Sequence, residues 1–335
     1  MKITKLLCSV IMAAVLQTGM AGGAAASVWD DYKARFVTPE GAVYDNANGI
    51  IHSESQGYGL MFALAWQDEE TFKRILKWTE ENLQDPKSGL FYWSYHPNEA
   101  NHLPDKNNAS DGDLFIAWTL LKAAKRFNEP SYAQKALKIA TGLMGNVITQ
   151  YAGLQVMLPG KDGFYYNSSV TINLSYYILP AFKAMAAHTH MALWDQLYKD
   201  ALKLISRIKD AGFNVPIAPD WISLSAQGVI KPADEWPARS SFDAIRVPVY
   251  LFWNDANDPN LEPWRNWWRG HNPTNTPAWV NVTTGEVAEY PLTPGLAAVR
   301  DLVLGGAAQE PTIDERDDYY NASLKMLVFL AKNHF

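Results

Sequence analysis

Residues 109–128 read ASDGDLFIAWTLLKAAKRFN, and this stretch carries the helical pattern that decides the fold. Its apolar residues recur at the three- and four-residue spacing of one helix face: Leu114, Ala117, Trp118, Leu121 and Ala124. The serine and acids that precede this stripe are typical of a helix N-terminus. The stretch therefore predicts a helix over residues 111–128.

The same spacing recurs along the chain, with clusters of Pro and Gly between the helical segments. We find no low-complexity linker, and only residues 89–95 alternate as a short hairpin would. Many helices joined by loops predict paired helices that close a ring or stack as a solenoid, and no internal repeat chooses between the two. The other expected helices span residues 29–36, 56–65, 69–83, 131–150, 170–188, 191–211, 242–254 and 319–332.

Three expected helix starts share a design in which an acid follows a capping serine, namely Glu54 after Ser53, Asp111 after Ser110 and Asp243 after Ser240. Acids in the first turn favour the helix dipole and need no further function. Asp113 has the spacing of a capping-box acid, so we assign it that structural role, and the same box can explain Asp243. Glu54 and Asp111 have no capping role, which makes them candidates for chemistry.

Three glycines lie inside these helix starts: Gly57, Gly59 and Gly112. Each costs about 1 kcal/mol relative to alanine in a helix. They predict that a ligand approaches the backbone here, or that two helices pack closely.

The segment ASDGD at residues 109–113, with the apolar helix after it, resembles the signature of glycoside hydrolase family 8. Three further segments resemble that family's motifs: SESQGYG at 53–59, around its proton donor, NLSY at 173–176 and FDAIRVP at 242–248. Thr119 departs from the pattern, which usually has Ser or Ala. Four matches in order give a resemblance over nearly the whole chain. Among family members, it is most similar to endoglucanases encoded with bacterial cellulose synthases.

The resemblance implies an all-α fold, an (α/α)6 barrel of six inner and six outer helices, as one catalytic domain over residues 27–335. It implies an inverting endo-β-1,4-glucanase in which Glu54 is the general acid and Asp243 the general base. Asp111 would bind the sugar at the cleavage point and help to fix the attacking water. The position of the base varies within the family, so Asp111 stays open as the alternative base. Inversion needs the acid and the base about 6.5–9.5 Å apart.

A general acid must keep its proton, whereas a helix N-terminus favours the ionised form of Glu54. Burial or a neighbouring carboxylate opposes ionisation, and Asp111 is the neighbour that we expect to do so. For substrate binding we expect Trp93, Asn173, Tyr176 and Arg246, with Arg246 orienting Asp243 or a sugar hydroxyl. The 13 tryptophans and 16 tyrosines of the chain suit sugar stacking, although a large aromatic core explains them equally.

We expect no metal and no cofactor. His188 and His190 are the pair that suggests a metal site, but two residues apart on a helix they point in different directions.

Residues 1–26 have the features of a cleavable signal peptide: Lys2 and Lys5, an apolar run over residues 6–16, and Ala24-x-Ala26. A membrane span would need about 20 apolar residues, and this run is too short and interrupted. We therefore expect cleavage before Ser27, export to the periplasm or the medium, and no membrane span afterwards. The only cysteine, Cys8, lies in this segment, so core burial has to stabilise the mature chain.

Loss of the two leader lysines lowers the basic count from 29 to 27 against 35 acids, a net charge of −8. No run of Lys or Arg indicates binding to nucleic acid or to an anionic membrane. We expect a β-glucan substrate and a monomer, and the resemblance adds the cellulose synthase export machinery as a partner.

Other functions remain open. Within the family, a chitosanase, a xylanase or a mixed-linkage glucanase fits the same motifs. A polysaccharide lyase or a non-catalytic polysaccharide-binding protein is a different class, and all three carboxylates in their motif context disfavour both.

Overall fold

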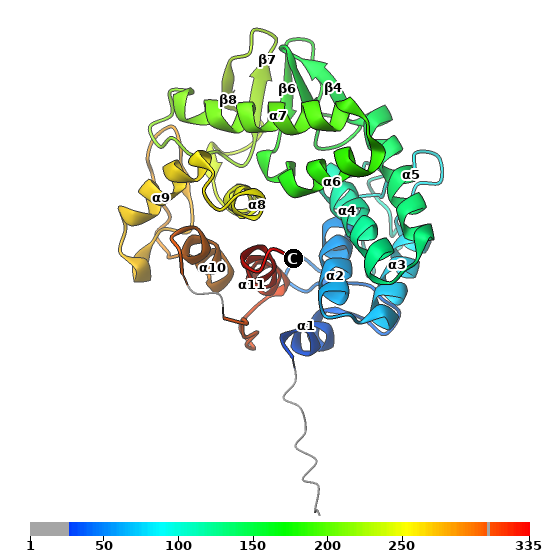
Figure 1. Cartoon of the computed structure of the whole chain (residues 1–335). Coiled ribbons are helices and arrows are strands. Elements are labelled where there is room, and N and C mark those ends of the chain that lie inside the picture. Colours follow the sequence, from blue (N-terminus) through cyan, green and yellow to red (C-terminus); the bar gives the residue numbers. More distant parts are fainter. Residues whose placement is uncertain (1–26, 307–308) are drawn as a thin grey trace, which may run out of the picture.

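Eleven α-helices in the described part of the chain are arranged around a common centre (Figure 1). The structure is a computed structural model that describes residues 27–306 and 309–335. The expected signal peptide, residues 1–26, lies outside the described residues. The helices are α1 Val28–Phe36, α2 Ser53–Ala65, α3 Glu69–Asn82, α4 Ser110–Arg126, α5 Pro130–Asn146, α6 Leu179–Thr189, α7 Ala192–Arg207, α8 Arg246–Asn254, α9 Glu262–Arg269, α10 Pro294–Val303 and α11 Tyr319–Lys332.

Helices α2, α4, α6, α8 and α11 form the inner ring, and each packs against the next, with α11 returning to α2. Helix α10 packs against α8 and α11, and the outer helices α3, α5 and α7 cover α2, α4 and α6 (Figure 1). Burial follows this division. In α2 all residues from Ser55 to Leu64 are buried, whereas α3 buries one stripe that includes Phe72 and Ile75. A helix that is apolar on all sides belongs in an interior, and an amphipathic helix belongs at the surface.

This ring of paired helices confirms the predicted helical barrel. Six inner and six outer helices would number twelve, one more than the described residues form. Between α10 and α11, the described residues 304–306 and 309–318 form no helix. Gly305, at φ +92°, ends α10, and Gly306 and Pro311 disfavour a new helix.

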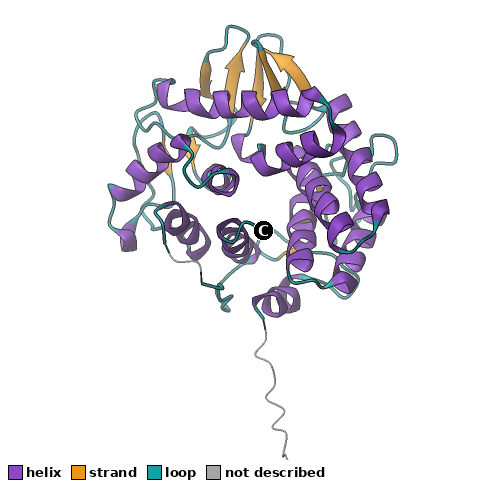
Figure 2. Ribbon diagram, viewed as in Figure 1, coloured by secondary structure: helices purple, strands orange, loops and turns teal. Residues whose placement is uncertain are grey.

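The described residues also form ten short strands, and the longer ones lie together at the edge of the ring beside α7 (Figure 2). They form antiparallel sheets in the orders β1-β2-β3, β4-β5, β6-β7-β8 and β10-β9. Among the residues that the structure describes there are four 3-10 turns: η1 Leu174–Tyr176, η2 Ile208–Asp210, η3 Pro259–Leu261 and η4 Pro273–Asn275. The strands are β1 Tyr44–Asp45, β2 Ile50–His52, β3 Ser94–Tyr95, β4 Ile148–Tyr151, β5 Leu154–Met157, β6 Ser169–Ile172, β7 Ile222–Ser225, β8 Ile230–Pro232, β9 Arg239–Ser240 and β10 Val280–Asn281.

Three expected helices were wrong at one end. The segment 170–188 starts as β6, because its β-branched residues pair with β7, and α6 begins only at Leu179. The segment 131–150 ends at Asn146, since the β-branched residues after it form β4. In 242–254, the first four residues form a turn, and α8 begins at Arg246. The short helices α9 and α10 were not expected at all.

The segment 89–95 is not a hairpin. It pairs with three separate partners: Phe91 bridges Gln84, Tyr92 bridges Asn108, and β3 pairs with β2. The segment is extended because it pairs with residues outside itself and not with its own other half.

The expected capping serines do not cap. His52 caps α2 by accepting the Ser55 N–H, and Ala109 starts α4 with no side-chain cap. The Asp113 carboxylate does not cap either. It is buried and accepts hydrogen bonds from the Phe91 N–H (2.7 Å) and from Asn108 Nδ2 (2.8 Å). Its role is structural, but it ties a neighbouring loop to α4 instead of closing a helix turn.

The three glycines mark tight packing. A Cβ on Gly112 would lie 2.8 Å from the Ser53 carbonyl carbon, and one on Gly57 would touch Phe115 and Ile116. At Gly59 the neighbour is Val43, in the loop beside α2. Close packing of α2 and α4 brings the start of one helix beside the start of the other.

Among the described residues, no helix combines the length and the apolar character that crossing a bilayer requires.

Candidate active site

A cleft of about 390 Å³ opens where α2 and α4 begin and where the turn before α8 meets them. Parallel inner helices that start at the same end of the ring bring their first residues together there. The cleft is lined by Asp45, Asn48, Ile50, His52, Ser53, Glu54, Trp93, Ala109, Asp111, Tyr176, Asp243 and Arg246.

The Arg246 guanidinium contacts all three predicted catalytic carboxylates. Nη1 is paired with Glu54 and lies 3.3 Å from Asp111 Oδ2, and Nη2 lies 2.7 Å from Asp243 Oδ1. Arg246 is the first residue of α8 and is 2% exposed. Its rigid fork of donors can bridge several carboxylates at once, as a lysine cannot. One buried cation thus joins residues that are up to 192 positions apart in the sequence.

Asp111 lies at the bottom of the cleft and is 5% exposed. Burial raises the pKa of its carboxyl to about 7, although the Gly112 N–H, 2.8 Å from Oδ1, acts in the opposite direction. Asp111 therefore holds a proton far more readily near neutral pH than a free aspartate does.

Asp243 lies in the turn before α8, not in the helix as expected, and a third of its side chain is exposed. Burial raises the pKa of its carboxyl to about 8, and repulsion from Asp220 and Asp111 adds to the rise. Its partial exposure leaves it accessible to water.

Glu54 is the second residue of α2, and its side chain is 16% exposed. Three carboxylates around one guanidinium carry an excess of negative charge. Such a cluster favours keeping a proton at neutral pH, which is a requirement for a general acid.

Two of the four expected substrate-binding residues are aromatic and line the cleft. Trp93 is 36% exposed, and its indole N–H donates to Asp105 Oδ2 at 2.8 Å, which fixes the ring. The Tyr176 ring lies 5.9 Å from the Arg246 guanidinium and contacts Trp221 edge-on.

Asn173 does not line the cleft, unlike the other expected binding residues. It is fully buried, and its Oδ1 accepts from the Ser175 hydroxyl at 2.7 Å. That hydroxyl in turn accepts from Arg246 Nη2 at 3.0 Å. Asn173 therefore supports Arg246 from behind.

Sequence reasoning missed several residues at this site. His52 Nε2 lies 3.4 Å from Asp45, and its Nδ1 accepts the Ser55 N–H, so the proton is on Nε2. Asp220 accepts hydrogen bonds from Ser241 and Ala244, on either side of Asp243. No sequence pattern marks Asp220. Asp45 and His52 could have been suspected only from their position next to the strands that precede α2.

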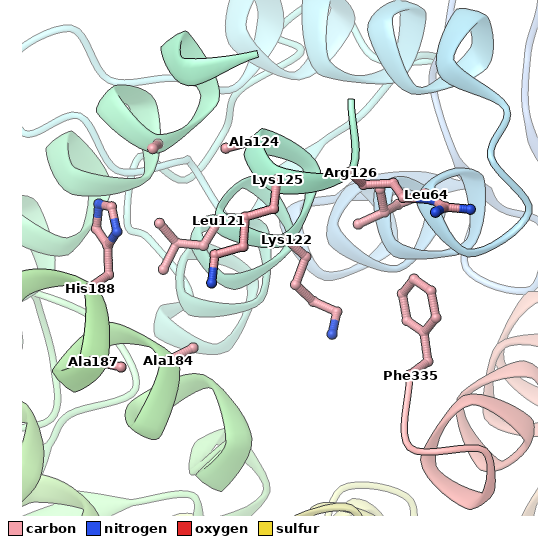
Figure 3. Close-up of a pocket in the computed structure, with 11 residues that line it drawn as sticks. Leu64, Leu121, Lys122, Ala124, Lys125, Arg126, Ala184, Ala187, His188 and Phe335 are labelled. Carbon is pink, nitrogen blue, oxygen red and sulfur yellow. The ribbon is translucent and has the colours of Figure 1, made fainter. Parts of the chain in front are cut away.

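A larger pocket of about 640 Å³ lies at the other end of the same inner helices (Figure 3). The ends of α2, α4 and α6 form it, with Lys122, Lys125, Arg126 and His188 around an apolar floor that includes Phe335. No Asp or Glu side chain lines it, so it lacks the pair of carboxyl side chains that glycoside hydrolysis uses. The two pockets lie at opposite ends of α4, a helix of 17 residues and roughly 25 Å.

The described residues contain no group of three or more His, Cys, Asp or Glu side chains arranged to hold a metal ion. His188 lies in the last turn of α6. His190 follows the helix in the left-handed conformation, with φ 55°.

Known proteins are similar to this chain over most of its length. The model of the family "Glycosyl hydrolases family 8" matches residues 4–334. The chain is 43% identical over 282 residues to an endoglucanase from Cellulomonas uda, covering 84% of this chain and 78% of the relative.

Two solved structures are similar to this chain over most of their length. One is a family 8 endoglucanase from Klebsiella pneumoniae, with 45% identity, a TM-score of 0.89 and coverage of 92% of this chain and 99% of that one. The other is an endo-β-1,4-glucanase from Acetobacter xylinum, with 36% identity, a TM-score of 0.87 and coverage of 91% and 97%. The motifs, the helical ring, the carboxylate cluster and these matches agree, and the chain belongs to glycosyl hydrolases family 8.

Proposed function

We propose that this protein is an inverting endo-β-1,4-glucanase that hydrolyses internal bonds of cellulose-like glucans. The observation that carries the proposal is the contact of one buried guanidinium with Glu54, Asp111 and Asp243 in a single cleft. The names of the similar proteins support the substrate class, since they are endoglucanases and one is an endo-β-1,4-glucanase.

Glu54 is the general acid in this proposal. Its proton moves to the glycosidic oxygen as the bond from that oxygen to the anomeric carbon breaks. A water on the other face of the sugar attacks the anomeric carbon and gives its proton to Asp243, the general base. After the reaction Glu54 has lost a proton and Asp243 has gained one. Proton exchange with solvent then restores both groups for the next turnover.

Asp111 binds the sugar at the cleavage point and helps to hold the attacking water. Its raised pKa gives it a hydrogen to donate to a sugar hydroxyl near neutral pH, and its ionised form can accept one. Trp93 and Tyr176 supply the apolar ring faces on which sugar rings stack.

We also propose that the enzyme is exported. A signal peptide over residues 1–26 would take the enzyme to the periplasm or the medium, where it acts on cellulose during its synthesis or processing beside the cellulose synthase export machinery. We propose a monomer, since one cleft holds all the named groups of the reaction.

The test is the release of reducing sugar from a panel of carboxymethylcellulose, mixed-linkage β-glucan, xylan and chitosan. The proposal expects carboxymethylcellulose to be cleaved with a rapid fall in viscosity, since internal cuts shorten the chain at once. NMR of early products from cello-oligosaccharides should show the α anomer. Preference for chitosan or xylan would assign another activity of the family, and an unsaturated product would indicate a lyase.

A further inference from the structure

The turn that carries Asp243 is held by a carboxylate that no motif includes. Asp220 Oδ1 accepts the Ser241 N–H at 2.9 Å and the Ala244 N–H at 2.8 Å, and its other oxygen accepts the Ser241 hydroxyl. These donors stand two residues before Asp243 and directly after it. Asp220 thus holds the backbone on both sides of Asp243.

Asp220 is itself firmly placed. Its N–H donates to the Arg239 carbonyl at 2.7 Å, next to β9. The neighbouring Trp221 ring stacks with Phe164, at 5.9 Å and 6° between planes, and with Trp236, at 4.4 Å and 11°. These two ring contacts help to hold the segment that carries Asp220.

The other side of the turn has a separate support. The Tyr320 hydroxyl from α11 donates to the Phe242 carbonyl, and Arg246 Nη2 holds the Asp243 carboxylate at 2.7 Å. The turn also has two backbone hydrogen bonds, from the Ile245 N–H to the Ser241 carbonyl and from the Arg246 N–H to the Asp243 carbonyl, both at 3.1 Å. The side-chain contacts add to these and help to fix Asp243 to the fraction of an ångström that catalysis needs.

We propose that Asp220 is a positioning residue for hydrolysis, which holds the turn over residues 241–244 so that Asp243 faces the cleft and receives the proton of the attacking water. This inference rests on the proposed function, in which Asp243 is the base.

Asp220 also acts on Asp243 through charge. The charged and titratable groups around Asp243 are Asp220, Asp111, Glu54, Arg246, Tyr176 and Tyr320. Of these, Asp220 is the largest source of repulsion that raises the pKa of Asp243. A base must be ionised, so removal of this repulsion should extend activity to lower pH.

Two substitutions separate the two effects. Asp220→Asn keeps an oxygen for both backbone N–H groups, and its NH2 can donate to the Ser241 hydroxyl, so the turn stays in place without the charge. Asp220→Ala removes the grip. We expect Asp220→Ala to lower kcat on cello-oligosaccharides about 100-fold with little change in KM, as a base displaced by about 1 Å would. We expect Asp220→Asn to keep most of kcat and to move the acidic limb of kcat/KM to lower pH.

Asp200 is the matched control. It is a buried aspartate that likewise accepts a backbone N–H, from Gln155 at 2.9 Å, but it lies on α7 outside the site. Asp200→Asn and Asp200→Ala should change the thermal midpoint and leave the acidic limb where it is in the wild type.

The proposal is overturned if folded Asp220→Ala turns over within about threefold of the wild type, or if the limb of Asp220→Asn does not move. If Asp220→Ala does not fold, the limb of Asp220→Asn decides alone. Asp243→Asn distinguishes this from a failure of the proposed function. An active Asp243→Asn removes the base assignment, whereas an inactive Asp243→Asn with unaffected Asp220 variants removes only the positioning role.

Discussion

Arg246 Nη1 lies 3.3 Å from Asp111 Oδ2, although 135 positions separate the two residues in the sequence. The same guanidinium also holds Glu54 and Asp243, so three carboxylates share one cation. The stability of the folded protein and its activity should therefore both depend on Arg246. The contribution of Arg246 to stability should also vary with pH.

Arg246→Met should destabilise the protein by about 3–5 kcal/mol near pH 8, the cost of leaving buried charges without their partner. The loss should be smaller near pH 4. In the variant the folded carboxylates have pKa values further above the unfolded value, so the folded state binds more protons and its stability falls as the pH rises. Chemical denaturation at both pH values measures this. An equal loss at both would show that the guanidinium matters by packing alone.

Arg246→Lys keeps a positive charge but loses the planar fork. We expect it to restore part of the stability lost in Arg246→Met and little of the activity, because a single ammonium cannot hold three carboxylates in place. Recovery of activity together with stability would mean that charge alone is needed.

Glu54→Gln should lower turnover on soluble cellulose derivatives by at least about 10²–10⁴, the usual contribution of general acid catalysis. The fold and the binding of oligosaccharides should remain, since the amide has the same shape and the side chain is partly exposed. Glu70→Gln is the matched control, because Glu70 also lies in the first turn of a helix but is exposed on the outer α3. Near wild-type turnover of Glu54→Gln would remove Glu54 from the mechanism.

Asp243→Asn and Asp111→Asn should both lose turnover but should differ in their pH profiles. If Asp243 is the base, the wild-type acidic limb lies above the range of a free aspartate, toward the pKa of about 8 that burial and its acidic neighbours give it. Residual activity of Asp243→Asn should lack this limb. Asp111→Asn should keep the limb and move the alkaline one to lower pH, because the repulsion that holds the proton on Glu54 is reduced.

Small nucleophiles give a second test of the same assignment. Azide should restore turnover to Asp243→Asn, where it can replace the activated water. Rescue of Asp111→Asn alone would place the base at Asp111, and a β-configured product of the wild type would exclude inversion altogether.

Gly112→Ala should destabilise the protein by about 1–3 kcal/mol, a typical cost of overpacking. The new methyl would lie 2.8 Å from the Ser53 carbonyl carbon, where α2 and α4 begin. Gly145→Ala is the control, since nothing lies within 4 Å of its Cβ in α5, and it should stabilise by up to about 1 kcal/mol. Thermal unfolding of both variants measures the difference, and equal effects would contradict the close packing.

Export should leave a mature N-terminus at or near Ser27. Ser27 caps α1 by accepting the Asp30 N–H, so cleavage there would leave the first helix complete. N-terminal sequencing of protein from the periplasm and the medium checks this, and finding Met1 retained would contradict it.

The amino-acid sequence by itself determined the helical class and named the candidate reacting groups. Helix-forming periodicity is local, so the stripe of residues 114–124 could be recognised without any tertiary contact. Glu54, Asp111, Asp243 and Arg246 were named because four short motifs occur in the order of the family. Local patterns also misled where neighbours decided the outcome. The residues after Asn146 and those over 170–172 became strands because a partner strand lay beside them.

Only the tertiary structure decided how these groups act on one another. Arg246 could be expected to orient Asp243, three residues away, but its contacts with Glu54 and Asp111 span 192 and 135 positions and exist only because the inner helices start at one end of the ring. Asp113 and Asp220 show the same limit. Each accepts hydrogen bonds from a backbone segment about 21 to 24 residues away. No local sequence pattern predicts such a bond, because the packing of whole elements brings its two partners together.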